Sequence, residues 1–323
     1  MKKKTENVTT CENMFSMSKE NGIINHDATI ITKDEKIKFR CTKCGVCCVE
    51  SNISVSPFDM YNMAKSLNIT CFDFFKEYCT FYLSENTGIP IVVLNDAQNG
   101  PCKFLKADVS NYQFECSLAE DARPMICRLN PFGAITRRNV KGSTNEKMYI
   151  LNNTCGAADT ETSVAEYCKS YFIHVKEHEA AQDVYFFPCF VMDINKYLSA
   201  LEKAADNGDE NSIEMRNVFP LYIMQLLFNF DTSKDFMEQI NKCKKNTVFF
   251  LVSLCSAYYV TNGENDACDF LKDLTQPVAS VFGSNDAFLQ EYTGYSKMSD
   301  ILQNNLFNDL GGKVLDYIRT KLK

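Results

Sequence analysis

The chain of 323 residues contains no tryptophan and only three histidines. Its thirteen glycines never form G-x-G, and no G-x4-G-K-[ST] run occurs, so the fingerprints of dinucleotide-binding Rossmann domains and of P-loop proteins are missing. The G-x-S-x-G elbow of α/β-hydrolases is also missing, and so is the C-x3-C-x2-C spacing associated with radical S-adenosylmethionine enzymes. No sequence motif therefore assigns the chain to one of these enzyme classes.

Long apolar runs are also lacking. The longest candidate, residues 247–260, is shorter than the ~18 apolar residues that a membrane span needs and contains Ser253 and Ser256, so we expect a buried helix there. The opening residues, MKKKTENVTT, are not followed by an apolar segment, which argues against a secretory signal peptide. We expect a cytoplasmic protein, in which thiols stay reduced and clustered cysteines bind metal or carry out redox chemistry.

Basic residues are in the minority. The 34 Lys and Arg residues against 41 Asp and Glu residues give a net charge of −7. An acidic chain lacks the excess of cations that non-specific binding to phosphates requires, so we expect no nucleic-acid partner. Apolar residues make up 45% of the chain, which is enough for a folded core, and the length suits about two domains.

Cysteine is the abundant reactive residue. Ten of the sixteen cysteines fall between Cys41 and Cys155. Four of them form the compact pattern C-x2-C-x2-C-C, at Cys41, Cys44, Cys47 and Cys48. A C-x2-C turn can aim two sulfurs at one metal ion, and Gly45 permits the left-handed backbone that such a turn often needs. Because Cys47 and Cys48 are adjacent, one of them is expected to face a second metal or to pack.

Further metal ligands are predicted at cysteines that lie beside turn signals. They are Cys102, Cys116, Cys127 and Cys155, each with a glycine, proline or asparagine within a few positions in the sequence. Together with the compact pattern they could form two sites with four ligands each, or one site plus structural thiols. Cys71 and Cys79 lie on a predicted helix rich in phenylalanine, where core packing is favoured.

Arg123 and Arg128 are candidates for supporting a bound metal. Four thiolates around Zn²⁺, or around a [4Fe–4S]²⁺ core, leave a net charge of −2. Two nearby guanidinium groups would offset this charge and could donate N–H groups to sulfur. Surface or structural ion pairing is the alternative role for both arginines.

These segments together resemble a known family. The pattern C-x2-C-x2-C-C over residues 41–48, followed by R-P-x2-C-R-x2-P-F over residues 123–132, is similar to the CxxCxxCC cysteine-cluster family, the zinc- or iron-chelating domain of the YkgJ type. The resemblance also includes residues 101–105, 116–118 and 155–156. It implies a small domain that binds zinc, iron or an iron–sulfur cluster. Some relatives are flagellin lysine N-methylases, which implies S-adenosylmethionine as a methyl donor and flagellin as a protein substrate.

Three functions follow from these observations. The leading prediction is a metal-binding protein, with iron–sulfur favoured over zinc because eight candidate thiolates exceed one structural zinc site. The second is a protein-lysine N-methylase, which rests on the resemblance alone. The third is a thiol-redox or metal-trafficking module in which Cys47 and Cys48 exchange metal or electrons.

A second short pattern contains two of the three histidines. Residues 174–178 match H-x-x-E-H, which on a helix would place His174 and His178 on one face with Glu177 as a general base. The charged neighbours favour a solvated helix face instead, and the catalytic residues of the chain remain unknown.

The predicted fold class is α+β. We expect a flexible arm over residues 1–36, a cysteine-rich metal-binding domain with short strands and helices over 37–160, and a mainly α-helical domain over 161–323. The predicted helices are 57–67, 70–81, 123–129, 162–179, 191–206, 212–229, 233–260, 264–274 and 296–320. Strands are predicted near Ile30 and at 89–94 and 148–152, with a hairpin from 103–106 and 113–117.

Overall fold

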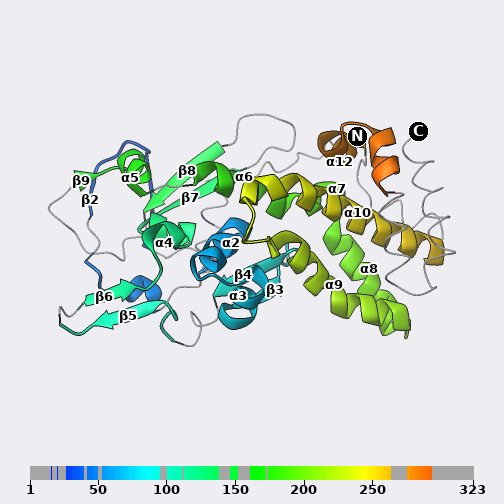
Figure 1. Ribbon diagram of the computed structural model, residues 1–323, viewed down its shortest axis with the longest axis horizontal. Helices are drawn as coiled ribbons and strands as arrows, with labels where there is room; N and C mark the ends of the chain where they lie inside the picture. Colours follow the sequence, from blue (N-terminus) through cyan, green and yellow to red (C-terminus); the bar gives the residue numbers. More distant parts are fainter. Residues whose placement is uncertain are drawn as a thin grey trace. The chain divides into compact units, whose positions relative to one another are not determined.

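The computed structural model describes residues 16, 20, 27–39, 42–49, 53–94, 100–110, 113–137, 146–151, 161–171, 174–262 and 275–292. The fold is α+β, as the sequence predicts, with short antiparallel strands in small sheets and longer helices toward the C-terminus (Figure 1). The chain divides into two compact units. Unit 1 contains residues 1–53 and 95–175, and unit 2 contains residues 54–94 and 176–323.

Unit 1 contains the cysteine motif and most of the strands. Its three-stranded antiparallel sheet has the order β1-β8-β7, and two smaller antiparallel pairs are β2 with β9 and β5 with β6. The strands are β1 (Thr29–Ile31), β2 (Ile37–Lys38), β5 (Leu105–Asp108), β6 (Gln113–Cys116), β7 (Phe132–Arg137), β8 (Glu146–Leu151) and β9 (Glu161–Thr162). The helical elements are η1 (Val46–Cys48), η2 (Glu120–Ala122), α4 (Met125–Leu129) and α5 (Val164–Tyr171).

Unit 2 is mainly helical. Its helices are α2 (Pro57–Ser66), α3 (Cys71–Tyr78), α6 (Val175–Phe186), α7 (Pro188–Val191), α8 (Ile194–Asp206), α9 (Glu210–Phe228), α10 (Phe236–Asn262) and α12 (Thr275–Phe282), and its hairpin pairs β3 (Cys79–Leu83) with β4 (Pro90–Leu94). In the α2 capping box, the Ser56 side chain accepts a hydrogen bond from the Asp59 N–H, and the Asp59 carboxylate accepts one from the Ser56 N–H. This cap and Pro57 at the first helical position explain why the predicted helix starts where it does.

Segment 54–94 belongs to unit 2 because its apolar side chains pack against the C-terminal helices. The ring of Phe58 lies 5.0 Å from that of Phe236 on α10. The Tyr61 hydroxyl donates a hydrogen bond of 2.7 Å to the carbonyl of Lys234. The ends of the segment meet, since Ser54 forms an antiparallel bridge with Val93.

Three features of the chain differ from the sequence predictions. The second predicted helix ends at Tyr78, because residues 79–83 pair with β4 as a strand. Strand β7 is not predicted, and it is formed by pairing with β8. The single helix predicted over 162–179 is two helices, α5 and α6. The helices predicted at 264–274 and 296–320 lie outside the described residues.

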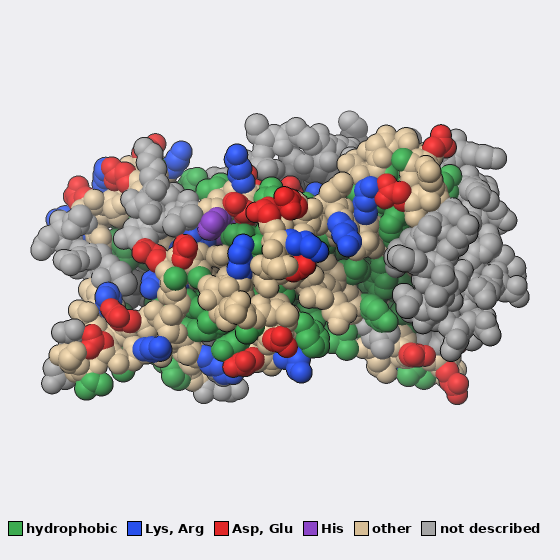
Figure 2. All heavy atoms as spheres, viewed as in Figure 1, with side chains coloured by type: hydrophobic (Ala, Val, Ile, Leu, Met, Phe, Trp, Pro, Cys, Tyr) green, Lys and Arg blue, Asp and Glu red, His purple; other side chains and the backbone are tan. Residues whose placement is uncertain are grey.

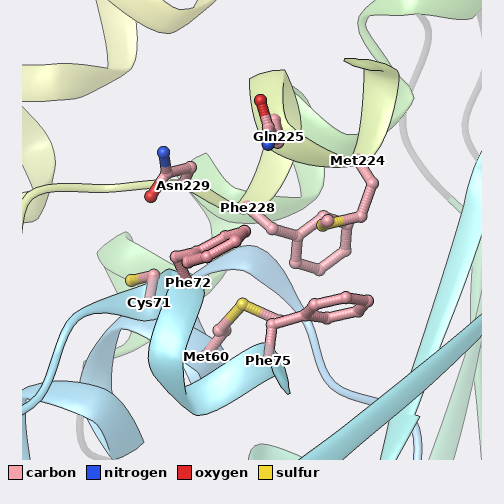
Figure 3. A pocket seen from close by; sticks show the side chains of 8 residues that line it. All are labelled: Met60, Cys71, Phe72, Phe75, Met224, Gln225, Phe228 and Asn229. Carbon is pink, nitrogen blue, oxygen red and sulfur yellow. The ribbon is translucent and has the colours of Figure 1, made fainter. Parts of the chain in front are cut away.

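The face seen in Figure 2 carries charges of both signs, and unit 2 contains a small pocket. Lys and Arg side chains are interspersed with Asp and Glu over the face seen in Figure 2. A small pocket of about 180 Å³ in unit 2 is lined by side chains of α2, α3 and α9 and by Asn229 (Figure 3). Pockets that hold drug-sized ligands are usually about 300–1,000 Å³, so this one is too small for S-adenosylmethionine. Within the described helices, none has the length and apolar character needed to cross a membrane.

Candidate metal centre

The cysteine motif folds as a tight knuckle. Gly45 has φ of 77°, the left-handed conformation predicted for it, and Lys43 has φ of 54°. The Cys48 N–H donates a 2.9 Å hydrogen bond to the Gly45 carbonyl, which closes the turn into η1. The turn places Cys44, Cys47 and Cys48 on one short stretch of backbone, with the first two exposed and Cys48 half-buried.

Hairpin β5–β6 holds this knuckle in place. The Phe114 N–H donates a 2.9 Å hydrogen bond to the Lys43 carbonyl, so the chain before the turn lies along the free edge of β6. The Lys43 ammonium also pairs with the Glu115 carboxylate at 2.5 Å. A Cβ atom at Gly45 would meet the Phe114 ring at 2.9 Å. The Phe114 ring therefore occupies the space that a side chain at position 45 would need. No sequence signal indicates this role of Phe114.

Cys102 is fixed directly against Cys48. Its N–H donates a 2.7 Å hydrogen bond to the Cys48 carbonyl, and its own carbonyl accepts one of 2.8 Å from Leu105 at the start of β5. Cys116 is the last residue of β6 and pairs in register with Leu105. Both cysteines are half-buried and lie at the same end of the hairpin.

Cys127 comes from a third segment, the short helix α4. Its N–H bonds to the Pro124 carbonyl at 3.0 Å in the first turn. The Arg123 Nε group donates a 3.4 Å hydrogen bond to the Leu118 carbonyl, and Arg128 is 5% exposed. A buried guanidinium stays charged and must be balanced by polar or anionic groups.

Electrostatics connects the thiols of these three segments. The sulfurs of Cys47 and Cys48 lie 3.9 Å apart. The hydrogen bond from Cys48 lowers the pKa of the Cys47 thiol to about 6, against the opposing effect of burial. The pKa of Cys48 is raised by that same hydrogen bond, by burial, and by the negative charges of Cys47, Cys127 and Cys102. Three of the predicted ligands therefore act on the Cys48 thiol.

The other predicted ligands are placed as follows. Cys44 is exposed and Cys116 half-buried, while Cys41 and Cys155 lie outside the described residues. No three His, Cys, Asp or Glu residues in the described ranges already stand in a metal-ligating arrangement. As predicted for packing residues, Cys71 and Cys79 are buried, although Cys79 begins a strand and is not on the helix.

The donor set fits a thiophilic metal. Two thiolates on one tetrahedral Zn²⁺ at about 2.3 Å lie roughly 3.8 Å apart, close to the 3.9 Å between Cys47 and Cys48. The adjacent cysteines can therefore both approach one ion, so the expectation that one of them faces elsewhere is not required by this geometry. The hydrogen bond with Cys47, burial and neighbouring negative charges raise the pKa of Cys48, and a bound cation would oppose these effects by favouring its thiolate form.

The H-x-x-E-H pattern forms neither a two-histidine helix face nor the solvated face that the sequence favours. His174 has φ of 65° and precedes α6, so it does not share a helix face with His178. His178 is 3% exposed, contrary to the expected solvated face, with its Nδ1 atom 3.9 Å from an Asp59 carboxylate oxygen. The Phe58 ring packs edge-on against it at 4.9 Å. His178 is thus a core histidine of unit 2.

Comparison with known proteins agrees with this thiol-rich geometry. Residues 40–156 match the CxxCxxCC family. The family is described as "Putative zinc- or iron-chelating domain", and the match covers less than half of the chain. The resemblance seen in the sequence is thereby confirmed, and the knuckle, the β5–β6 hairpin and α4 all belong to the CxxCxxCC segment. Searches of curated proteins and of solved structures found no match.

Proposed function

We propose that residues 40–156 hold a thiolate-ligated iron–sulfur cluster in the cytoplasm, with Cys47, Cys48, Cys102 and Cys127 at its core. The observation that carries the proposal is the placement of these thiols: the Cys47 and Cys48 sulfurs lie 3.9 Å apart, and the Cys102 N–H is bonded to the Cys48 carbonyl. The charges of Cys102 and Cys127, from two other segments of the chain, also act on the Cys48 thiol. Cys41, Cys44, Cys116 and Cys155 are proposed as the ligands of a second group, because one cluster, like one structural zinc ion, takes four thiolates.

The arginines are proposed to balance the charge of the bound group. A cluster with four thiolate ligands carries a net charge of −2, and such sites are tuned by donors around the sulfurs. Arg128 is the better placed of the two, because it is buried and directly follows Cys127 on α4. Arg123 already donates to a backbone carbonyl through Nε and retains its other N–H groups for sulfur.

Anaerobic purification tests the proposal. Metal analysis, acid-labile sulfide and the visible spectrum should together report stoichiometric iron and sulfide with a brown chromophore. A colourless protein with stoichiometric zinc would overturn the iron–sulfur assignment and leave a zinc centre. A protein that binds neither metal would overturn the metal centre itself.

Substitution of one thiol should separate ligands from packing residues. Cys48→Ser removes the thiol on which Cys47, Cys102 and Cys127 all act, and it should abolish stoichiometric metal binding. Cys189→Ser, at a half-buried cysteine in unit 2, is the matched control and should retain metal. Loss of metal from both variants would argue against the proposed ligand set.

Thiol or metal exchange is the second candidate function. Its support is the exposed Cys47 thiol, whose pKa is lowered to about 6 and which would be largely thiolate at neutral pH. Rapid alkylation of Cys47 in the protein as isolated would favour exchange. Slow alkylation that becomes rapid after chelator treatment would favour a fixed centre.

Lysine N-methylation of flagellin stays a prediction from the resemblance. The pocket of unit 2 is too small to supply the S-adenosylmethionine site. Incubation of the anaerobic protein with labelled S-adenosylmethionine and flagellin tests it, and absence of transfer would count against it.

A further inference from the structure

We propose that Tyr167, which lies outside the matched segment, is a positioning residue for the metal centre and sets the placement of α4 relative to the cysteine knuckle. The inference rests on the proposed function, since it concerns the geometry of that same thiol site. It is carried by contacts within unit 1 alone.

The segments on either side of residues 40–156 pair with each other. Strand β2 and strand β9 are antiparallel, with Ile37 opposite Thr162 and Lys38 opposite Glu161. The Ala165 N–H donates a 3.1 Å hydrogen bond to the Lys33 carbonyl. Lys36 and Glu166 form an ion pair across the same junction. Residues 33–38 and 161–167, which we call the clasp, therefore bring together the two ends of the matched segment.

Tyr167, in this clasp, contacts the cysteine-bearing segment through both its hydroxyl group and its ring. Its hydroxyl donates a 2.9 Å hydrogen bond to the Asn130 carbonyl, at the end of α4. Its ring packs edge-on against Phe39 at 6.0 Å and Phe132 at 5.1 Å. Both phenylalanines are less than one-tenth exposed, so these contacts lie in the interior.

The partners of Tyr167 are close in sequence to predicted ligands. Phe39 stands two residues before Cys41, and Asn130 stands three residues after Cys127. The helix that carries Cys127 also packs on α5, the helix that carries Tyr167. One side chain therefore contacts both Phe39, which precedes the cysteine motif in the sequence, and Asn130, which follows α4. The distance of the Cys127 thiol from the Cys48 thiol depends on these two positions together.

Removal of the Tyr167 hydroxyl distinguishes a positioning role of this residue from a packing role. Tyr167→Phe keeps the ring contacts but leaves the Asn130 carbonyl without this donor, so the end of α4 is less well fixed. Groups that orient metal ligands typically change metal affinity by about 10–100-fold. We expect Tyr167→Phe to take up the same amount of metal as the wild type but to release it about 10-fold faster, with an altered visible circular dichroism spectrum of the centre.

Two control variants distinguish this role from general loosening. Glu166→Gln breaks the exposed ion pair of the clasp and should release metal at the wild-type rate. Ile31→Val loses one methylene from the apolar cluster that contains Phe132, and it should lower the melting temperature without changing the spectrum. The measurement is the rate of metal transfer to pyridylazoresorcinol, recorded with melting curves for all four proteins.

The outcomes separate the two proposals. A wild-type protein without metal overturns both the metal centre and the role of Tyr167. A wild-type protein with metal, and a Tyr167→Phe variant with unchanged release and spectrum, overturns the positioning role alone. If Ile31→Val changes the release rate and spectrum as much as Tyr167→Phe does, Tyr167 is merely a structural residue.

Discussion

At the scale of single residues, Gly45 shows how much a sequence can indicate. Its place inside C-x2-C predicts a left-handed turn, and its φ of 77° confirms this. The second constraint, the Phe114 ring 2.9 Å from where a Cβ would stand, comes from a residue 69 positions away. No local sequence pattern predicts such a contact, because it depends on how the β5–β6 hairpin packs against the knuckle.

We expect Gly45→Ala to disturb the cysteine knuckle and lower its metal content. A left-handed conformation costs a residue with a Cβ about 1–2 kcal/mol, and the clash with Phe114 adds to that cost. Gly100→Ala is the matched control in the same unit, since nothing lies within 4 Å of its Cβ position. Urea unfolding and metal analysis measure both effects. Equal behaviour of the two variants would contradict the prediction.

Cys47 and Cys71 should differ strongly in reactivity toward iodoacetamide in metal-free protein. The thiolate is the nucleophile, so alkylation follows ionisation. The Cys47 pKa is lowered to about 6, so its rate should rise with pH around 6 and be nearly constant at higher pH. Burial raises the pKa of Cys71 to about 12, so it should stay unreactive at neutral pH. Mass spectrometry of peptides at several pH values measures both, and a Cys47 rate that rises only near pH 9 would refute the assignment.

At the scale of elements, strong local capping signals in the sequence were sufficient to predict where a helix starts. Ser56, Pro57 and Asp59 predict the start of α2, and the capping box confirms it. Strand β7 and the break between α5 and α6 were not predictable in the same way. The strand exists through pairing with β8, and the residues around His174 include no glycine or proline to mark an interruption.

Removing the α2 cap should destabilise unit 2. Ser56→Ala deletes the side-chain acceptor for the Asp59 N–H and the hydroxyl that donates to its buried carboxylate at 2.7 Å. Loss of such a cap typically costs about 1 kcal/mol. Ser199→Ala, at an exposed position within α8, should change the free energy of unfolding by far less. Urea unfolding followed by circular dichroism compares them, and similar losses in both variants would show that the cap contributes little.

At the scale of the whole molecule, the compact units do not follow the sequence order. The cysteine spacing predicts one domain over residues 37–160, whereas segment 54–94 packs with the C-terminal helices. Composition could not reveal this, because the segment contains Cys71 and Cys79 among its aromatic residues and resembles its neighbours. The match over residues 40–156 includes the segment within its bounds.

A fragment of residues 27–175 should bind metal if residues 55–92 are replaced by Asn-Gly. Ser54 and Val93 are bridged, and a two-residue turn is the usual link between antiparallel partners. The same fragment with residues 55–92 retained should aggregate, because Phe58 and Met60 lose the helices that cover them. Size-exclusion chromatography and metal analysis compare the fragments. Monomeric behaviour of the longer fragment would show that segment 54–94 does not need those helices.

Unit 2 consists of two stretches that are far apart in the sequence, and this has a consequence for its folding during synthesis on the ribosome. Segment 54–94 is made early, but its partners begin only at residue 176, 82 residues after residue 94 (176 − 94). At about 5–20 residues per second, that interval is roughly 4–16 s. The β5–β6 hairpin and α4, which end at Cys116 and Leu129, are both synthesised within this interval. The cysteine knuckle can therefore form before the apolar side chains of residues 54–94 are buried. During this period, those exposed side chains are a binding site for a chaperone.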